Sequence, residues 1–213
     1  MRSQKIRGIG CYIDHLFTGV LGYADDIILI CPSVSALNEM IKICEEYADD
    51  HNILFNGKKS KYLVFGNYEY SPTIKVNNEQ VPKCDSAIHL GHTLNTKYTK
   101  NTLIEESIKS FNKSFYGFMS KFDGCNTTVR NKLFHQYCSS MYGSQLWDLT
   151  NKNVENMCIQ WRNAHRRVLS VPGRTHCDLL PLIADNMPLE VKLDCKYIGF
   201  FKSVSTSDNE LLK

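Results

Sequence analysis

Hydrophobic and polar residues alternate in two different ways along this chain of 213 residues. Up to about residue 95 the apolar runs are short and are broken by glycine, asparagine and aspartate. Beyond that point apolar residues recur every three or four positions, which is typical of amphipathic helices. The pattern therefore predicts an α+β protein whose mixed first part precedes an all-helical part.

The first part is expected to hold several strands around one helix. Apolar runs at 9–20 and 27–30 predict two strands that flank a tight acidic turn. From Ser35 to Asp49 apolar residues recur at steps of three and four, which predicts a helix with one apolar face. Further strands are expected at 53–55, at 62–65, over 73–81 as a hairpin that turns at Asn77-Asn78, and over 88–94.

The second part opens with an aromatic stripe at steps of four and three: Ile104, Ile108, Phe111, Phe115, Phe118 and Phe122. This spacing predicts one long helix whose stripe lies in a core, where Trp147 and Trp161 are also expected. Further helices are expected from a cap at Thr127 or Thr128, over 154–169, and from Pro188 onward. In the second of these four helices Val129, Leu133, Tyr137 and Met141 would face the core.

Composition narrows the class of protein. Nine widely spaced cysteines with no CxxC pair favour buried thiols in a reducing compartment over disulfides or a zinc ribbon. No secretory signal and no apolar run of about 18 residues is visible, so we expect no membrane partner and an intracellular location.

The charge is unevenly distributed. Residues 97–174 carry 12 Lys or Arg against 5 Asp or Glu, whereas the rest of the chain carries 13 against 17. A basic helical part suits a protein that handles a polyanion, although an ordinary solvated surface gives the same balance.

The letters YADD occur twice, at 23–26 and at 47–50. In the first copy Asp25 and Asp26 lie between apolar strands, where a tight turn would expose adjacent carboxylates. Carboxylates are the ligands that Mg²⁺ prefers, and two such ions can activate a hydroxyl and stabilise a departing pyrophosphate. In the second copy Asp49 and Asp50 end an amphipathic helix and are expected to face solvent. An acidic turn is also common without a metal, so the motif alone leaves both interpretations open.

The ordered set of motifs resembles reverse transcriptases of non-LTR, LINE-type retrotransposons. Tyr23-Ala24-Asp25-Asp26 looks like their active-site motif, and FNGKKS at 55–60 is similar to their FNxxKS segment. His89-Leu90-Gly91 resembles the YLG segment of the primer grip, with His in place of Tyr. YGSQLW at 142–147, the helix from Trp161 to Arg167, and RTHCDLLP at 174–181 resemble the region that follows the palm.

The resemblance implies a partial right-hand polymerase fold. Residues 1–95 would be the C-terminal part of the palm, 96–148 thumb-like helices, and 149–213 a C-terminal helical region. The activity would be RNA-directed DNA polymerisation with Mg²⁺, or Mn²⁺ in its place. An RNA template, a DNA primer and deoxynucleoside triphosphates would be the partners, in the nucleus or the cytoplasm.

Site residues are carried over by position. Asp25 would hold the metal ions together with a palm aspartate from outside this sequence, and Asp26 would be its weaker companion. Lys59 would approach the triphosphate as a general acid. Tyr23 and Gly91 would lie near the primer. Apart from this carry-over, Arg162, Arg166 and Arg167 with His165 form the densest basic cluster, and helix-borne arginines suit phosphate contacts, with a plain solvated surface as the alternative. Lys109, Lys113, Arg130 and Lys132 could also contact phosphates, but no spacing singles them out.

Met1 lies close to the YADD strands, so the fingers and the first catalytic aspartate of the family have no counterpart in this sequence. We therefore expect a fragment that is inactive alone and that a separate chain could complement. The alternative is a non-catalytic nucleic-acid-binding module that uses its basic helices.

Overall fold

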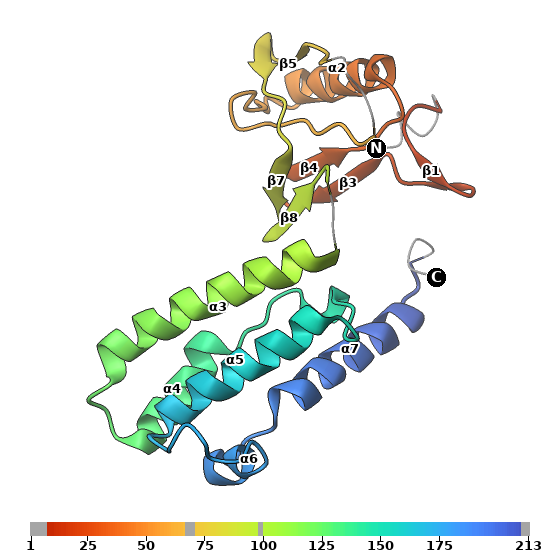
Figure 1. The fold of residues 1–213 in the computed structure, drawn as a ribbon. Coiled ribbons are helices and arrows are strands. Elements are labelled where there is room, and N and C mark those ends of the chain that lie inside the picture. Colours follow the sequence, from red (N-terminus) through yellow and green to blue (C-terminus); the bar gives the residue numbers. More distant parts are fainter. Residues whose placement is uncertain (1–7, 67–70, 98–99, 210–213) are drawn as a thin grey trace. The chain divides into compact units, whose positions relative to one another are not determined.

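The computed structural model of the protein describes residues 8–66, 71–97 and 100–209 (Figure 1). The chain divides into two compact units, Met1–Lys97 (unit 1) and Tyr98–Lys213 (unit 2). Among the described residues, the strands and one helix belong to unit 1, whereas unit 2 is helical. The predicted α+β class is confirmed at this level. No helix in these described stretches is long and apolar enough to cross a membrane.

The strands of unit 1 form antiparallel hairpins that remain separate two-stranded sheets in the described residues. The hairpins are β1 (Tyr12–Ile13) with β2 (Leu16–Phe17), β3 (Val20–Tyr23) with β4 (Asp26–Leu29), β5 (Ile74–Val76) with β6 (Glu79–Val81), and β7 (Ser86–His89) with β8 (His92–Asn95). A continuous sheet of the kind expected for a polymerase palm is not identified among them.

Two expected strands are in fact hairpins. The segment 9–20 contains the β1–β2 hairpin, and only its last residue, Val20, joins the strand before the acidic turn. The segment 88–94 turns back at Leu90 and Gly91, both of which have positive φ values, of 49° and 77°. Two successive positive φ angles make a type I′ turn, which reverses the chain within two residues. A turn this short does not interrupt the apolar pattern, so the sequence did not reveal it.

The strands expected at 53–55 and 62–65 are absent from the structure. Leu54 is 86% exposed, and Tyr62 forms only an isolated bridge to Lys83. Apolar runs this short do not fix a strand unless a partner strand lies beside them. The hairpin predicted around Asn77-Asn78 is confirmed, since both asparagines adopt positive φ between β5 and β6.

Helix α2 (Val34–Asp50) confirms the predicted helix of unit 1. The side chain of Ser33 caps it by accepting a hydrogen bond from Ala36 N at 3.2 Å. Its apolar face packs on the β5–β6 hairpin, where Ile41 meets Ile74 and Val81 in a small core.

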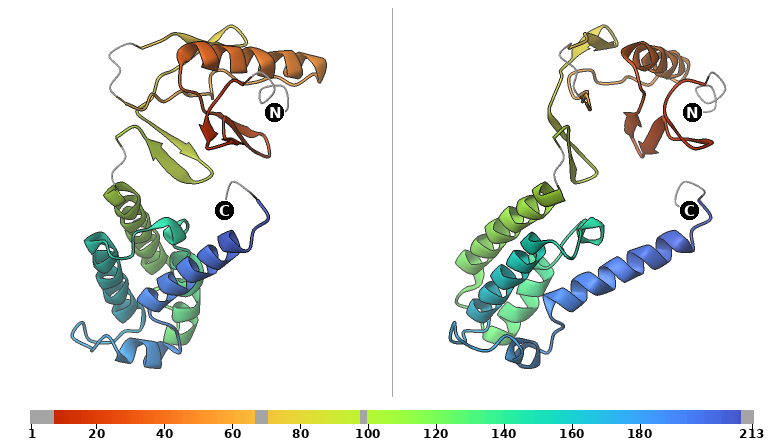
Figure 2. Two further views of the ribbon diagram at one scale, coloured as in Figure 1. Left: turned by 90° about the vertical axis from the view of Figure 1, so that its right-hand side faces the viewer. Right: turned by 45° about the vertical axis from the view of Figure 1, so that its right-hand side comes forward.

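Unit 2 contains α3 (Lys100–Phe122), α4 (Thr127–Cys138), a 3₁₀ turn η1 (Ser144–Leu146), α5 (Lys152–Val168), α6 (Leu179–Ala184) and α7 (Leu189–Ser205). Helices α3, α4 and α5 lie side by side around one core (Figures 1 and 2). The short α6 and the turn η1 have no counterpart among the predicted elements, because three to six residues are too few to show a helical period.

The predicted aromatic stripe of α3 lies in this core, together with Trp147 and Trp161. Phe134 of α4 is fully buried at its centre, and its ring is 6.0–6.4 Å from those of Phe111, Phe115 and Phe118. Core residues come from both sides of the expected boundary at 148/149.

The predicted core face of α4 is wrong in part. Val129 and Tyr137 are 49% and 60% exposed, and the helix instead buries the face that carries Arg130 and Phe134. The cap is Asn126 and not Thr127 or Thr128 as predicted, because the Asn126 side chain accepts a hydrogen bond from Thr128 N.

The cysteines are less buried than expected. Cys138 and Cys158 are buried as free thiols, whereas Cys195 is exposed and the remaining six are half-buried. Burial raises the pKa of the Cys138 thiol to about 11 and that of the Cys158 thiol to about 12, so both remain protonated at neutral pH.

Candidate functional site

The first YADD segment forms the tip of the β3–β4 hairpin. Tyr23 pairs with Asp26, so Ala24 and Asp25 are the two central turn residues. Of these two, Ala24 has a positive φ of 53°, which is the type II′ pattern usually given to glycine. A positive φ costs a non-glycine residue about 1–2 kcal/mol. Eight other described non-glycine residues also have positive φ, so the two adjacent carboxylates, and not the backbone angle, make this tip a candidate site.

Both carboxylates of this tip face solvent. Asp25 and Asp26 are exposed, and the neighbouring Tyr23 is 65% exposed. Two adjacent carboxylates on a hairpin could share a hard divalent cation such as Mg²⁺. Where the structure describes the chain, no third histidine, cysteine or acid completes a metal-holding group with them.

The second YADD segment lies in the last turn of α2, as predicted. Asp49 and Asp50 are exposed there, and His51 follows as the C-terminal cap. The negative end of the helix dipole disfavours carboxylates in this turn, so it is a poor place to gather ligands for an anionic substrate.

Lys59 follows a tight turn that Asn56 builds. The Asn56 side chain accepts a hydrogen bond from Lys59 N at 3.0 Å, and Ser60 Oγ donates to Asn56 O at 2.9 Å. Gly57 is buried in this turn, where an added Cβ would come within 2.8 Å of Glu79 Cβ. The side chain of Lys59 is exposed, and no ion pair in the described residues joins it to the YADD carboxylates.

Gly91 and His89 belong to the β7–β8 hairpin. Gly91 is exposed in its turn, and His89 pairs directly with His92 across it. The two histidines therefore lie on paired strands, with the Leu90-Gly91 turn between them.

The three arginines of α5 do not form one cluster. Arg162 pairs with Glu190 of α7, and Arg166 donates to Thr175 O at 2.9 Å and to Asn163 Oδ1 at 2.9 Å. These two lie on the edge of α5 that faces α7 and the segment before α6. Arg167 lies on the other edge, over the rings of α3.

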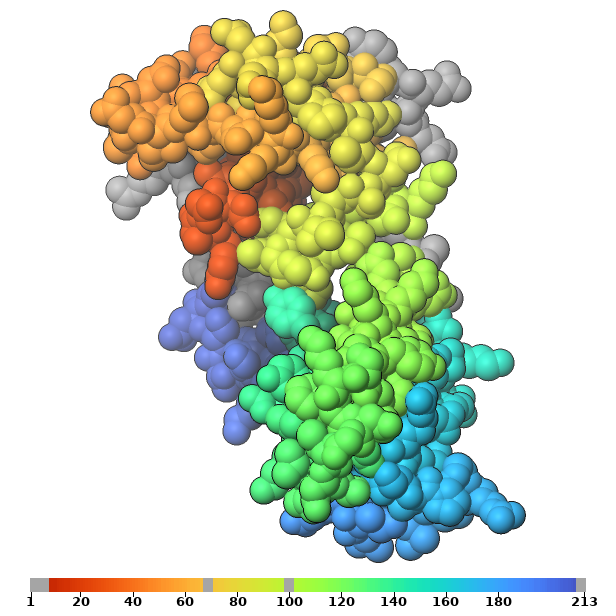
Figure 3. Space-filling model, turned by 90° about the vertical axis from the view of Figure 1, so that its left-hand side faces the viewer, coloured from red at the N-terminus to blue at the C-terminus, as the bar shows by residue number. Residues whose placement is uncertain are grey.

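Arg167 keeps an exposed position beside two aromatic rings. Its guanidinium carbon is 5.2 Å from the Phe115 ring centroid and 5.7 Å from that of Tyr116, which is itself 60% exposed. Lys109 and Lys113 are exposed on the same helix α3. We call Lys109, Lys113, Tyr116 and Arg167 the α3–α5 face. Helix α3 covers a large part of the side of unit 2 that Figure 3 shows.

Arg130, a further candidate for phosphate contacts, is 4% exposed and serves the fold instead. Its Nε donates to Val168 O at 2.7 Å, its Nη1 donates to Asp123 O at 2.8 Å, and its Nη2 donates to Ser170 Oγ. The guanidinium therefore binds oxygens that follow α3 and end α5, and at 4% exposed it is not accessible to a phosphate.

A buried polar network in unit 2 was not foreseen. His165 is 1% exposed, and its Nε2 contacts Asn131 Oδ1 at 2.9 Å. Burial lowers the pKa of His165 to about 3 and, with the nearby Lys192 ammonium, that of His135 to about 4. Both imidazoles are thus neutral near pH 7. The sequence signal was present, because Asn131 and His135, like Trp161 and His165, are spaced i, i+4 on core-facing helices.

One group with metal-ligand chemistry lies in unit 2, outside the predicted site. His176, Cys177 and Asp178 offer ligand atoms within 4.8 Å of one another. His176 and Asp178 are both exposed, with Nδ1 and Oδ2 3.3 Å apart. Cys177 between them is half-buried, and exposed groups of this kind occur often without an ion.

Comparison of the chain with models of protein families, with characterised proteins and with solved structures gives no match.

Proposed function

We propose that the chain is the C-terminal palm and thumb portion of an RNA-directed DNA polymerase of the non-LTR type. The observation that carries this proposal is the YADD tip. Asp25 and Asp26 are consecutive, exposed residues at a hairpin turn with a positive φ at Ala24, where a divalent ion can reach them. In this proposal unit 1 is the palm portion and unit 2 the thumb with the region after it.

The chemistry assigned to each residue follows from its side chain. Asp25 and Asp26 would hold Mg²⁺ ions that lower the pKa of a primer 3′-hydroxyl and neutralise the leaving pyrophosphate. Lys59, whose turn leaves its ammonium exposed, would donate a proton to that pyrophosphate. Gly91, lacking a Cβ, would permit a primer backbone to approach the β7–β8 turn.

The two-ion site requires one more carboxylate than the described residues place beside Asp25. We propose that it comes from a fingers-and-palm segment, covalently attached or supplied as a separate chain. Primer extension should therefore be absent with the purified chain alone and should appear when such a segment from a reverse transcriptase of this type is fused to its N-terminus.

In the fused protein Asp25→Asn should lower primer extension with Mg²⁺ at least about 100-fold, since one ligand oxygen loses its charge. The matched control is Asp49→Asn, which alters the same letter of the second YADD copy and should leave the rate unchanged. Extension that survives Asp25→Asn would refute the proposal.

A second candidate function, binding of nucleic acid without catalysis, is favoured by the α3–α5 face. Exposed lysines suit phosphates, and an arginine stacked on an exposed tyrosine offers a platform for a base. This function requires only unit 2.

Its test is the salt dependence of binding between the purified chain and a fluorescent primer–template duplex. Arg167→Gln should weaken binding and lower the slope of log K against log salt by about 1, because one fewer counterion is released. Arg174→Gln changes an exposed arginine outside this face and serves as the control. Equal effects of the two variants would rule out a specific role for the face.

A further inference from the structure

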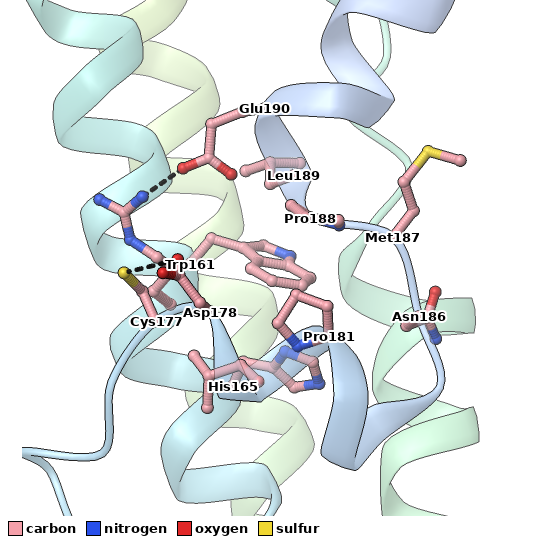
Figure 4. A pocket seen from close by; sticks show the side chains of 12 residues that line it. Trp161, His165, Cys177, Asp178, Pro181, Asn186, Met187, Pro188, Leu189 and Glu190 are labelled. Carbon is pink, nitrogen blue, oxygen red and sulfur yellow. Dashed lines mark hydrogen bonds and ion pairs between the residues drawn. The ribbon is translucent and has the colours of Figure 1, made fainter.

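Helix α7 is attached to the rest of unit 2 along one side and mainly at its start. There Glu190 pairs with Arg162 of α5, beside a cavity of about 360 Å³ that Trp161 helps to line (Figure 4). Leu189 and Leu193 are 1% and 2% exposed and belong to the core of unit 2. Beyond Leu193, every residue of the helix is exposed or half-buried. The second half of α7 therefore has a side that unit 2 leaves uncovered.

A row of exposed apolar side chains runs along this uncovered side. Ile198 and Phe201 are 64% and 65% exposed, Val191 is 42% exposed, and Cys195 is exposed beside them. Steps of four and three place these residues on one face of a helix, which points away from the buried Leu189. Single exposed apolar residues are ordinary, whereas a continuous row of them on one helix face favours a binding surface.

Two opposite charges lie at the ends of this row. Asp194 and Lys202 are exposed, and each is four residues, about one helical turn, from Ile198. They lie about 12 Å apart along the helix, too far to pair with each other. Neither side chain makes a hydrogen bond or an ion pair within the described part of the chain. The other charged side chains of α7 already contact groups of unit 2: Glu190, Lys192 and Lys196.

This order of charges is complementary to itself when two copies of α7 pack in opposite directions. With Ile198 at the centre, Asp194 of one copy lies opposite Lys202 of the other, and two-fold symmetry repeats the contact. Two copies packed in the same direction would instead place each charge opposite its own kind. The charges therefore favour the antiparallel arrangement over the parallel one.

The shape of this side of α7 suits such packing. Residues four apart, such as Asp194, Ile198 and Lys202, form the ridges that interdigitate in the commonest class of helix pairs. The neighbouring row contains Cys195 and Gly199, and a Cβ added at Gly199 would meet nothing within 4 Å. This shallow row leaves room for the Ile198 ridge of a second copy.

We propose that two copies of the chain associate through α7 as an antiparallel, two-fold symmetric pair. The contact is formed by six residues, which we call the α7 face: Val191, Asp194, Cys195, Ile198, Phe201 and Lys202. A contact of this size is small for a protein dimer, so the pair is weak, with a dissociation constant in the micromolar range. The inference goes beyond the polymerase proposal and does not depend on it, because the YADD tip takes no part.

The test is sedimentation velocity of the purified full chain over a range of concentrations, in which the sedimentation coefficient should rise from that of a monomer towards that of a dimer. Ile198→Glu should weaken the dimer at least about 100-fold, because both copies lose an apolar contact and gain like charges at the centre. Leu182→Glu is the matched control. It places the same charge on an exposed leucine of α6 and should leave the equilibrium unchanged.

Charge reversal tests the antiparallel order. Asp194→Lys and Lys202→Asp each turn two attractive contacts into two repulsive ones, so each should weaken the dimer about tenfold. The double variant exchanges the two charges and should restore the association of the unchanged chain. Since all three substituted side chains are exposed, the variants should keep the far-UV circular dichroism of the unchanged chain.

Three outcomes would overturn the proposal. A chain that stays monomeric at every concentration would show that the α7 face does not bind a second copy. A dimer that Ile198→Glu leaves intact would place the contact elsewhere on the molecule. A dimer that Ile198→Glu disrupts, but that neither charge reversal weakens, would exclude the antiparallel pairing.

Discussion

Unit 2 buries an unbroken stripe of aromatic and aliphatic side chains from α3, α4, α5 and α7, whereas the core of unit 1 is centred on three buried residues from α2 and one hairpin. The strands of unit 1 lie in separate pairs, and a lone two-stranded hairpin is marginally stable in water. The comparison shows where each unit places its chemistry. Unit 1 exposes its candidate catalytic groups on turns, and unit 2 encloses a neutral polar network within a packed core.

The largest effect is expected where the core of unit 2 is most tightly packed. Phe134→Ala should destabilise unit 2 by about 3–5 kcal/mol, because a fully buried ring contacted by several others leaves a cavity. Chemical denaturation followed by near-UV circular dichroism measures this loss. Val129→Ala on the exposed side of the same helix should cost far less, and equal losses would contradict the assignment of the buried face.

The next effect concerns the buried guanidinium. Arg130→Met should destabilise unit 2 by about 3 kcal/mol, because Val168 O loses a buried donor and Asp123 O a half-buried one. Lys132→Met, two residues away and exposed, should leave the unfolding free energy within about 0.5 kcal/mol. If the Arg130 variant kept full stability but lost nucleic-acid binding, a phosphate contact would replace the structural role.

A smaller loss of folding stability is expected when the pH is lowered. The pKa of His165 is lowered to about 3 by burial, with further contributions from His135 and Lys192, the charged or titratable groups that face it. The unfolded chain therefore binds protons below about pH 6.5 while the folded unit does not, and stability falls as pH decreases. For His165 alone this amounts to about 2 kcal/mol between pH 7 and pH 5.

Urea unfolding at pH 7 and pH 5 measures this loss, and His165→Gln should reduce it. A His165 imidazole that titrates near pH 6.5 in the folded protein, followed by its ring proton signals, would show that the network is not closed to water.

The smallest effect tests how tightly unit 1 is packed. Gly57→Ala would bring Cβ within 3.0 Å of Val76 O and closer still to Glu79 Cβ, so the turn before Lys59 must shift at a cost of about 1 kcal/mol. Gly22→Ala on β3 has open space and provides the control. Thermal unfolding of the two variants should differ by this amount; indistinguishable melting would mean that the turn yields freely.

The long helices of unit 2 could be predicted because each has several turns of regular spacing. The α3 stripe, the helix over 154–169 and the start of the last helix at Pro188 all agree with the structure. The face of α4 was misassigned because Arg130 replaces an apolar residue on the buried side. The hairpin over 86–95 was predicted as a single strand, because Leu90-Gly91 reverses the chain within two residues and leaves no mark in the apolar pattern.

The candidate site residues were also predicted only in part. Sequence order singled out the YADD turn and Lys59, and the structure shows both exposed on turns. The same order grouped the three arginines of α5, although their neighbours take them to opposite edges of the helix. The sequence alone does not show whether an arginine is free to bind a phosphate or is already bound to another residue of the protein.

The sequence by itself determined the α+β class, the helical second part, the aromatic core and the acidic hairpin tip, because local spacing and turn chemistry act over a few residues. The tertiary structure alone decided which polar groups are buried. Asn131, His135 and His165 come from two helices, and the tautomer of His165 depends on an asparagine 34 positions away. Burial and hydrogen bonding are set by partners distant in the chain, so the cavity beside Trp161 becomes visible only in the folded protein.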